Sequence, residues 1–222
     1  MPRDVAAFDL DGTLTDGGSV FRWLRYLAGD ATAYRAATRL LVPLGVGALL
    51  SGAHADDAKE RLFRVLLAGR DAAEVAAASR AFGHDHFASH ARAAVVARLR
   101  AHADRGDDVV VVSASPEPYV TVIAELVGAS GALGTRLGVD ASGRLTGGYD
   151  GRNCRGEEKL RRVVEWIAQR GDVGELYAYG NSRGDRRLLA RADHPVDVGR
   201  LGRLGALRAF PRLGAAGPLS PG

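Results

Sequence analysis

The sequence predicts an α/β fold in which a parallel central sheet carries an inserted helical domain. Residues 5–8 and 108–112 form short apolar or β-branched segments, which are typical of strands buried on both faces. Between them, residues 16–90 show apolar side chains at helical spacing and no convincing strand, the pattern of a small helical bundle. A chain of 222 residues can bury one core and a smaller accessory domain, which agrees with this division.

The first predicted strand ends in two carboxylates and a glycine. Asp9 follows residues 5–8 directly, and Asp11 points to the same side of an extended chain. Ligands of open α/β sheets bind at the carboxyl ends of the strands. Two acids this close repel each other unless a proton or cation lies between them, which favours a Mg²⁺ site. The alternative is that Asp11 and Gly12 form only a tight turn after a strand.

The inserted segment is predicted to contain several amphipathic helices. Apolar residues recur three and four apart over 20–27. A second helix is predicted over 58–67, with Asp56 or Asp57 as its N-cap, and a third over 71–82. We therefore predict three parts. Residues 1–15 and 91–213 together form a core domain, and residues 16–90 form an inserted helical cap. Residues 214–222, rich in Pro, Gly and Ser, form a disordered tail.

Two segments raise the question of membrane contact. Residues 36–50 are the most apolar stretch, but they are too few to span a bilayer and are interrupted by Pro43. Residues 200–212 alternate leucines with arginines in a basic amphipathic pattern. For both segments, packing on the protein is favoured, and contact with a membrane surface is the less favoured alternative.

Three histidines, His84, His86 and His90, lie near the end of the inserted segment. On a helix, His86 and His90 would share one face and could bind a metal. No cysteine or second pair of acids completes a ligand set, so a polar hinge between the two domains is favoured.

The second half of the chain repeats the pattern of a strand followed by a helix. Helices are predicted over 91–105 and 119–127, and short strands over 133–139, 145–149 and 195–199. The strand over 108–112 leads to Ser113, with Ser115 as N-cap and Pro116 at the first helical position. Such a helix start presents free amides to an anion. The alternative is an ordinary capped helix with no ligand.

Lys159 and Asp185 complete the set of unusual polar residues. Lys159 lies in the first turn of a predicted helix over 157–169, where the helix dipole disfavours a cation unless an anion compensates it. A surface lysine is the alternative. A predicted strand over 176–180 is followed by Asn181 and, four residues later, by Asp185.

Composition and charge restrict the kinds of ligand and partner that this chain is expected to have. The net charge of +4 favours anionic ligands, phosphate esters included. Basic and aromatic residues are not interleaved, so a nucleic-acid partner is not expected. Cys154 is the single cysteine, which excludes an internal disulfide framework. With no secretory signal at the start of the chain, we expect a cytoplasmic protein.

Together these motifs resemble those of the haloacid dehalogenase superfamily. The pattern D-x-D-G-T-x-T is matched by Asp9, Asp11, Gly12, Thr13 and Thr15. Ser113 matches the second motif and Lys159 the third. The fourth, G-D-x-x-x-D, is matched by Asp185, but Asn181 stands where the first acid is usual. An amide oxygen contributes no charge, so weaker metal binding is expected.

The resemblance implies a Rossmann-like, three-layer core and a helical cap of the phosphoserine phosphatase-like branch. It implies Asp9 as nucleophile, Asp11 as general acid and base, and phosphoryl binding by Ser113, Ala114 and Lys159. The implied Mg²⁺ ligands are Asp9, Asp11, Asn181 and Asp185. Phosphoserine enzymes carry an acid just after the first motif to meet the substrate amine. Here glycines occupy that neighbourhood, and Asp16 is the available substitute.

The expected function is Mg²⁺-dependent hydrolysis of a small organic phosphate monoester through an aspartyl phosphate. The monoester could be phosphoserine, a phosphorylated lipid head group or another small phosphate. A phosphomutase is one alternative. A binding or regulatory protein with little turnover is the other, because of Asn181. The oligomeric state is not predicted.

Overall fold

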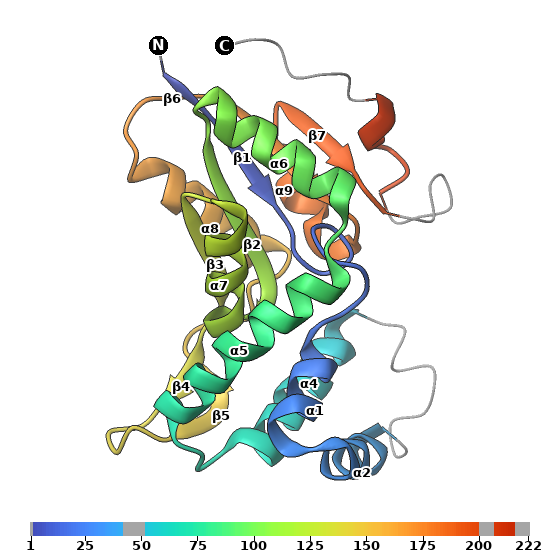
Figure 1. Cartoon of the computed structure of the whole chain (residues 1–222), viewed down its shortest axis with the longest axis vertical. Helices are drawn as coiled ribbons and strands as arrows, with labels where there is room; N and C mark the ends of the chain where they lie inside the picture. Colours follow the sequence, from blue (N-terminus) through green and yellow to red (C-terminus); the bar gives the residue numbers. More distant parts are fainter. Residues whose placement is uncertain (1, 42–51, 200–206, 216–222) are drawn as a thin grey trace.

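The computed structural model describes residues 2–41, 52–199 and 207–215, and its centre is a parallel sheet of five strands (Figure 1). The order is β3-β2-β1-β6-β7, so the first strand lies in the middle. The strands are β1 (Arg3–Phe8), β2 (Asp108–Pro116), β3 (Gly131–Thr135), β6 (Val173–Gly180) and β7 (His194–Asp197). From β1 the chain adds strands first on one side and then on the other. This creates a topological switch point at the carboxyl end of β1, where such sheets bind ligands.

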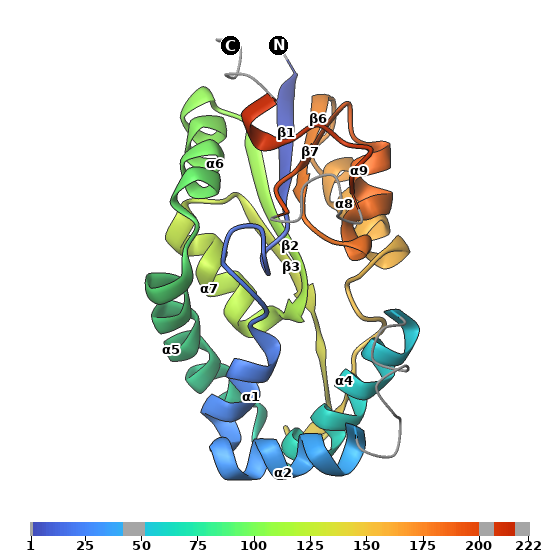
Figure 2. The ribbon, with the colours of Figure 1, turned by 90° about the vertical axis from the view of Figure 1, so that its right-hand side faces the viewer.

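Alternate residues of the central strands face two separate helical layers (Figure 2). Ala6 and Phe8 of β1 pack in one apolar cluster, while Val5 and Ala7 pack in another. The first cluster includes side chains of α6 (Ala93–Arg105) and α7 (Glu117–Val127), the second those of α8 (Glu157–Ala168) and α9 (Arg186–Arg191). The predicted three-layer α/β core is therefore confirmed.

In the described part of the chain, four helices between β1 and α6 form a layer beyond the carboxyl end of the sheet (Figures 1 and 2). They are α1 (Val20–Ala28), α2 (Asp30–Leu41), α4 (Gly52–Leu67) and α5 (Ala72–His90). The two connections to this layer run side by side: Asp16 N donates to His90 O at 2.9 Å and Arg92 N donates to Leu14 O at 2.8 Å. The core and cap boundaries given above stay a prediction.

A short hairpin, β4 (Leu137–Val139) with β5 (Leu145–Tyr149), lies with the inserted helices although it belongs to the second half of the chain. The backbone of Gly147 lies against α4 so closely that a Cβ there would stand 2.6 Å from Arg64 Cα. Gly69 N also donates to Leu145 O at 2.8 Å. We propose that this hairpin is part of the cap, which differs from its predicted place in the core segment 91–213.

Several predicted boundaries were wrong, and two of the polar residues expected to cap helices, Ser115 and Asp56, bind distant partners instead. The strand expected over 108–112 continues to Pro116, which pairs with Thr135, so Ser115 is not an N-cap. The strand expected over 133–139 divides between two sheets, as β3 and β4. Asp56 and Asp57 lie inside α4 and cap nothing, while the helix expected over 71–82 continues to His90 as α5. The last strand is β7 and ends at Asp197, not at residue 199.

Within the described ranges, no helix combines the length and apolarity needed to cross a bilayer. Most of the apolar stretch 36–50, the start of the basic segment 200–212 and most of the tail 214–222 lie outside the described residues. The described part of the basic segment packs on the core. Leu207 is buried in the second apolar cluster, and Arg212 pairs with Asp197 at 2.9 Å.

Candidate active site

Asp9 stands at the carboxyl end of the central strand, and its backbone is fixed by the neighbouring strand. Asp9 N donates to Tyr179 O of β6 at 2.9 Å, and the side chain is nearly buried. Thr13 Oγ1 donates to Asp9 Oδ2 at 2.9 Å from the turn that follows. The turn depends on Gly12, whose φ of +79° is costly for any residue with a Cβ. One carboxylate oxygen is thus oriented by its own turn.

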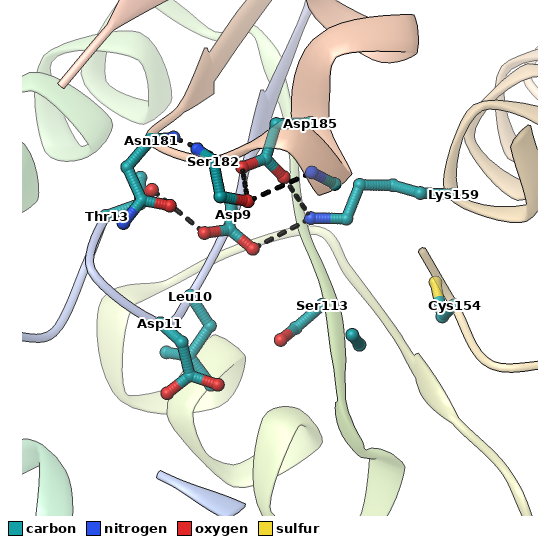
Figure 3. Close-up of polar contacts among 12 residues, drawn as sticks. Asp9, Leu10, Asp11, Thr13, Ser113, Cys154, Lys159, Asn181, Ser182 and Asp185 are labelled. Carbon is teal, nitrogen blue, oxygen red and sulfur yellow. Dashed lines mark hydrogen bonds and ion pairs between the residues drawn. The ribbon is translucent and has the colours of Figure 1, made fainter. Parts of the chain in front are cut away.

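Lys159 joins Asp9 to Asp185 (Figure 3). Its Nζ lies 2.8 Å from Asp9 Oδ1 and 2.5 Å from Asp185 Oδ1, and all three side chains are buried. A lysine in the first turn of α8 was expected to need a nearby anion. Two carboxylates supply that negative charge. The cluster holds two acids and one base, so it is short of one positive charge.

Burial and this charge imbalance govern the protonation of the cluster. Burial and the neighbouring Asp185 raise the pKa of Asp9 to about 7, although Lys159 opposes them. Burial alone would raise the pKa of Asp185, but Lys159 and the Ser182 hydrogen bonds bring it below its ordinary value. Burial opposes the charge of Lys159, yet the two carboxylates raise its pKa. Asp9 is consequently the member of the cluster whose charge most needs a further cation.

The loop after β6 holds Asp185 and leaves one amide oxygen unused. Asp185 Oδ2 accepts from Asn181 N at 3.1 Å and from Ser182 N at 3.0 Å and Ser182 Oγ at 2.8 Å. Asn181 Oδ1 is buried and has no hydrogen-bond partner among the described residues. A buried acceptor without a partner is costly, so this oxygen suits a ligand donor or a cation.

These donors fit a hard divalent cation. Asp9 and Asp185 supply carboxylate oxygens, and Asn181 supplies the unpartnered amide oxygen, all of the kind that Mg²⁺ prefers. In the described part of the chain, no three His, Cys, Asp or Glu side chains are grouped closely enough for metal binding. The substitution of an amide at position 181 accounts for the missing acid, and Mg²⁺ ordinarily completes its shell with water and phosphate.

Asp11 does not contact the cluster of Asp9, Lys159 and Asp185. Its Oδ1 accepts from Ser19 N at 2.7 Å, and its Oδ2 accepts a short hydrogen bond from Ser115 Oγ. Figure 3 shows the carboxylate directed away from Lys159. Two acids two residues apart in sequence therefore have different surroundings, one facing the lysine and the other facing hydroxyls.

The remaining predicted residues divide into two groups. Ser113 lies beside Asp9 and Asp11, and its Oγ accepts from Ser115 N at 3.0 Å (Figure 3). Ala114 follows on the same strand end. Asp16 instead pairs with His90 Nδ1 at 3.0 Å where the chain enters and leaves the inserted helices.

The histidines are placed apart from this cluster. His86 and His90 share a face of α5, with ring centroids 4.8 Å apart, but no third ligand group joins them in the described ranges. His86 stacks on Phe82, and burial lowers its pKa to about 4. Its neutral ring serves packing, while His90 binds Asp16 at the connection between the two segments.

Lys59 was missed by the sequence analysis. It reaches from α4 to Ala114 O at 2.5 Å and to Asn153 Oδ1 at 2.7 Å, and burial lowers its pKa to about 8. Its helix neighbour Asp56 accepts from Asn153 Nδ2 at 2.9 Å. The chain has only two lysines among 30 basic residues, and both reach this site. That scarcity was the signal available in the sequence.

Gly12→Ala is expected to disturb the site more than the strain of its backbone explains. A Cβ at Gly12 would lie 1.8 Å from Asn181 Nδ2, so the amide would have to move. Gly17→Ala is the matched control, since its φ is +67° but its Cβ would meet only the end of Arg22 at 3.7 Å. By urea unfolding, we expect about 1 kcal/mol of loss for the control and roughly 3 kcal/mol for Gly12→Ala. Equal losses would contradict the close approach.

The chain is similar in sequence to several known proteins. The family model described as haloacid dehalogenase-like hydrolase matches residues 6–190. Protein CicA of Caulobacter vibrioides is 35% identical over 189 residues, covering 85% of this chain and 83% of its own. A histidinol-phosphatase of Neisseria meningitidis is 29% identical over 200 residues, covering 88% and 90%.

Solved structures share the fold of this chain. A protein of unknown function from Bordetella pertussis superposes with a TM-score of 0.78 and 28% identity, covering 96% of this chain and 98% of that chain. A phospho-aspartyl intermediate analogue of phosphoserine phosphatase gives a TM-score of 0.62 with 19% identity, covering 89% and 87%, and shows likeness of fold alone.

Proposed function

Because this chain belongs to the family of haloacid dehalogenase-like hydrolases, we propose that it is a Mg²⁺-dependent phosphatase acting on a small phosphate monoester. The observation that carries the proposal is the buried cluster in which Lys159 joins Asp9 to Asp185 beside an unpartnered amide oxygen of Asn181. This cluster offers a nucleophile, the fixed positive charge of Lys159 and oxygen ligands for a metal cation. Transfer of a phosphoryl group uses the nucleophile for attack and the positive charges to stabilise the transition state.

In the proposed reaction, Asp9 attacks phosphorus in line with the leaving oxygen. A bond forms between a carboxylate oxygen of Asp9 and phosphorus as the ester bond to the alcohol breaks. Asp11 gives its proton to the leaving alcohol. Asp11 then accepts a proton from the water that cleaves the aspartyl phosphate, which releases inorganic phosphate and restores both acids.

The other residues hold the phosphoryl oxygens. Ser113 Oγ and the backbone amide of Ala114 lie on the strand next to Asp9, and Lys159 Nζ lies at its carboxylate. Fixed donors around a phosphoryl group stabilise charge in the transition state and fix the line of attack. Lys59 supports this strand end through the carbonyl of Ala114.

Asp9, Asp185, Asn181 and the carbonyl oxygen of Asp11 would hold Mg²⁺. When bound, the ion supplies positive charge that offsets the two acids and the phosphate. The pKa of Asp9, which burial raises to about 7, should fall with that charge nearby, so the carboxylate would be ionised and ready to attack at neutral pH.

The test of this function is release of inorganic phosphate from a broad panel of phosphate esters, with and without Mg²⁺, using Asp9→Asn as the blank. We expect turnover that requires Mg²⁺ and Asp9. Transfer of phosphate between positions of a sugar phosphate, without its release, would favour the phosphomutase alternative. A panel without any Mg²⁺-dependent release would contradict the phosphatase and favour a binding role.

Asn181→Asp is expected to raise the affinity for Mg²⁺ by roughly tenfold, about 1.4 kcal/mol, since it adds a charge to an oxygen already at the site. The shift in melting temperature during a Mg²⁺ titration measures it. Gln169→Glu, on the exposed end of α8, adds the same charge elsewhere and should leave the affinity unchanged. An unchanged affinity in Asn181→Asp would remove residue 181 from the ligand set.

Two relatives, the histidinol-phosphatase and phosphoserine phosphatase SerB1 of Mycobacterium tuberculosis, are named for phosphate esters of small molecules that carry an amine. We propose a small alkyl phosphate of this general kind. Asp16, the candidate for an amine, is engaged with His90, so an ammonium group in the substrate would have to compete with that pair.

A further inference from the structure

A line of buried hydroxyl groups ends on Asp11. Ser115 Oγ donates a short hydrogen bond to Asp11 Oδ2. Ser115 Oγ lies 3.1 Å from Ser19 Oγ, which lies 2.8 Å from the hydroxyl of Tyr119. Ser115, Ser19 and Tyr119 are all at most 1% exposed, so water does not compete for these bonds.

The direction of this line follows from counting protons. Each hydroxyl has one proton to donate. When Asp11 is ionised, as it is once the alcohol has left, Ser115 uses its proton on Asp11, so Ser19 donates to Ser115 and Tyr119 donates to Ser19. All three donors therefore point the same way, toward Asp11 Oδ2. The other oxygen, Oδ1, accepts from the backbone amide of Ser19.

The members of the line come from four separate parts of the fold. Asp11 follows β1, Ser115 lies near the end of β2, Ser19 stands at the start of α1, and Tyr119 lies in α7. The ring of Tyr119 is held between Trp23 and Phe82, with centroids 5.8 Å and 5.2 Å away. The carboxylate of Asp11 is thus tied to the sheet, to the helix behind it and to the first inserted helix.

We propose that Ser115, supported by Ser19 and Tyr119, is a positioning residue that aims Asp11 at the leaving oxygen of the substrate. The inference rests on the proposed function and adds the residues that make Asp11 effective. Because the hydroxyl line holds Oδ2 as an acceptor, the proton of the protonated carboxyl group is carried on Oδ1, and it passes from Oδ1 to the alcohol as the bond to phosphorus breaks. The alcohol leaves neutral, and Asp11 is left as the carboxylate.

This role gives a signature that loss of folding or of binding does not give. Protonation matters most for an alcohol that leaves poorly and least for one that leaves well as an anion. Phenyl phosphate and 4-nitrophenyl phosphate have nearly the same shape, but nitrophenolate leaves far more readily. The parameter to compare is kcat/KM, because it covers the steps up to departure of the alcohol and excludes the later hydrolysis common to both substrates.

Ser115→Ala is expected to lower kcat/KM for phenyl phosphate by about 30-fold and for 4-nitrophenyl phosphate by no more than about threefold. Tyr119→Phe keeps the packed ring and removes only the last hydroxyl of the line. It should change the same ratio in the same direction by roughly threefold, and it keeps the test available if Ser115→Ala folds poorly. Asp11→Asn sets the upper limit of the effect.

Ser79→Ala is the matched control. Ser79 is another buried serine, which accepts from Trp23 Nε1 at 2.8 Å and donates to Val75 O at 2.6 Å, but it has no bond to Asp11. Its loss should leave the ratio of the two substrates unchanged. Equal losses on both substrates in Ser115→Ala and Tyr119→Phe, or no loss on either, would overturn the positioning role while leaving the phosphatase intact. A wild-type protein that releases phosphate from no ester of the panel, these two included, would instead overturn the proposed function.

Discussion

Asp9→Asn is expected to abolish phosphate release, with a fall of at least about 10⁴-fold in kcat, because an amide oxygen cannot form the covalent intermediate. The change should do this without loss of fold. Asn keeps the size of the side chain and an oxygen that accepts from Lys159, which lies 2.8 Å from Asp9 Oδ1. Steady-state assays with Mg²⁺ on the best ester of the panel give the measurement. Residual turnover within tenfold of the wild type would exclude Asp9 as nucleophile.

The stability of the same variant is an independent check on the buried charges. Burial and Asp185 raise the pKa of Asp9 from 3.8 to about 7, so the folded protein binds this proton more tightly than the unfolded chain. Its contribution to stability is full below about pH 4 and is lost as the pH rises toward 7. Without metal, Asp9→Asn should escape that loss. Urea unfolding with a chelator should show a gain relative to wild type at pH 7.5 that shrinks at pH 5.

Lys159→Met is expected to have the largest combined effect on activity and stability. The change removes the only cation that touches both acids of the cluster among the described residues, at 2.8 Å and 2.5 Å. The two carboxylates would then be buried together without a counter-charge. Removing one partner of a buried ion pair in this way lowers the free energy of unfolding by about 3–5 kcal/mol. Turnover should fall by about 10³-fold, because the phosphoryl group also loses a fixed charge.

Lys59→Met is the matched control, since it removes the other lysine of the chain with the same change of side chain. Lys59 bonds neutral oxygens, those of Ala114 and Asn153, and Thr135 Oγ1 still donates to Ala114 O at 2.7 Å in its absence. Its loss should cost much less stability than that of Lys159. Equal losses of unfolding free energy in the two variants would show that the charge of Lys159 is not what holds the two acids together.

Sequence reasoning succeeded where short-range patterns decide the structure. Runs of apolar or β-branched residues predicted the central strands, and the parallel order brought their carboxyl ends to one edge. The meeting of Asp9 with Lys159, 150 positions away, was implied by the family resemblance and not by a local pattern. The family resemblance supplied the rest of the site, and the division of roles among its residues stays a proposal.

It failed where a polar group found a distant partner. Ser115 has the local pattern of an N-cap, but its hydroxyl binds Asp11, and β2 therefore continues to Pro116. Asp56 also resembles a cap, yet it lies inside α4 and pairs with Arg155 at 3.0 Å. No local pattern encodes these contacts, because each joins residues about a hundred positions apart. Lys59 was missed for the same reason.

The most direct test of the central claim is to trap the covalent intermediate. The protein would be mixed with Mg²⁺ and a turned-over ester, quenched in acid within one turnover, digested and analysed by mass spectrometry. We expect one phosphoryl group on the peptide that contains Asp9, sensitive to hydroxylamine as an acyl phosphate and absent in Asp9→Asn. Phosphate on Ser113 or another residue, or active enzyme that carries none under conditions that trap a related phosphatase, would contradict it.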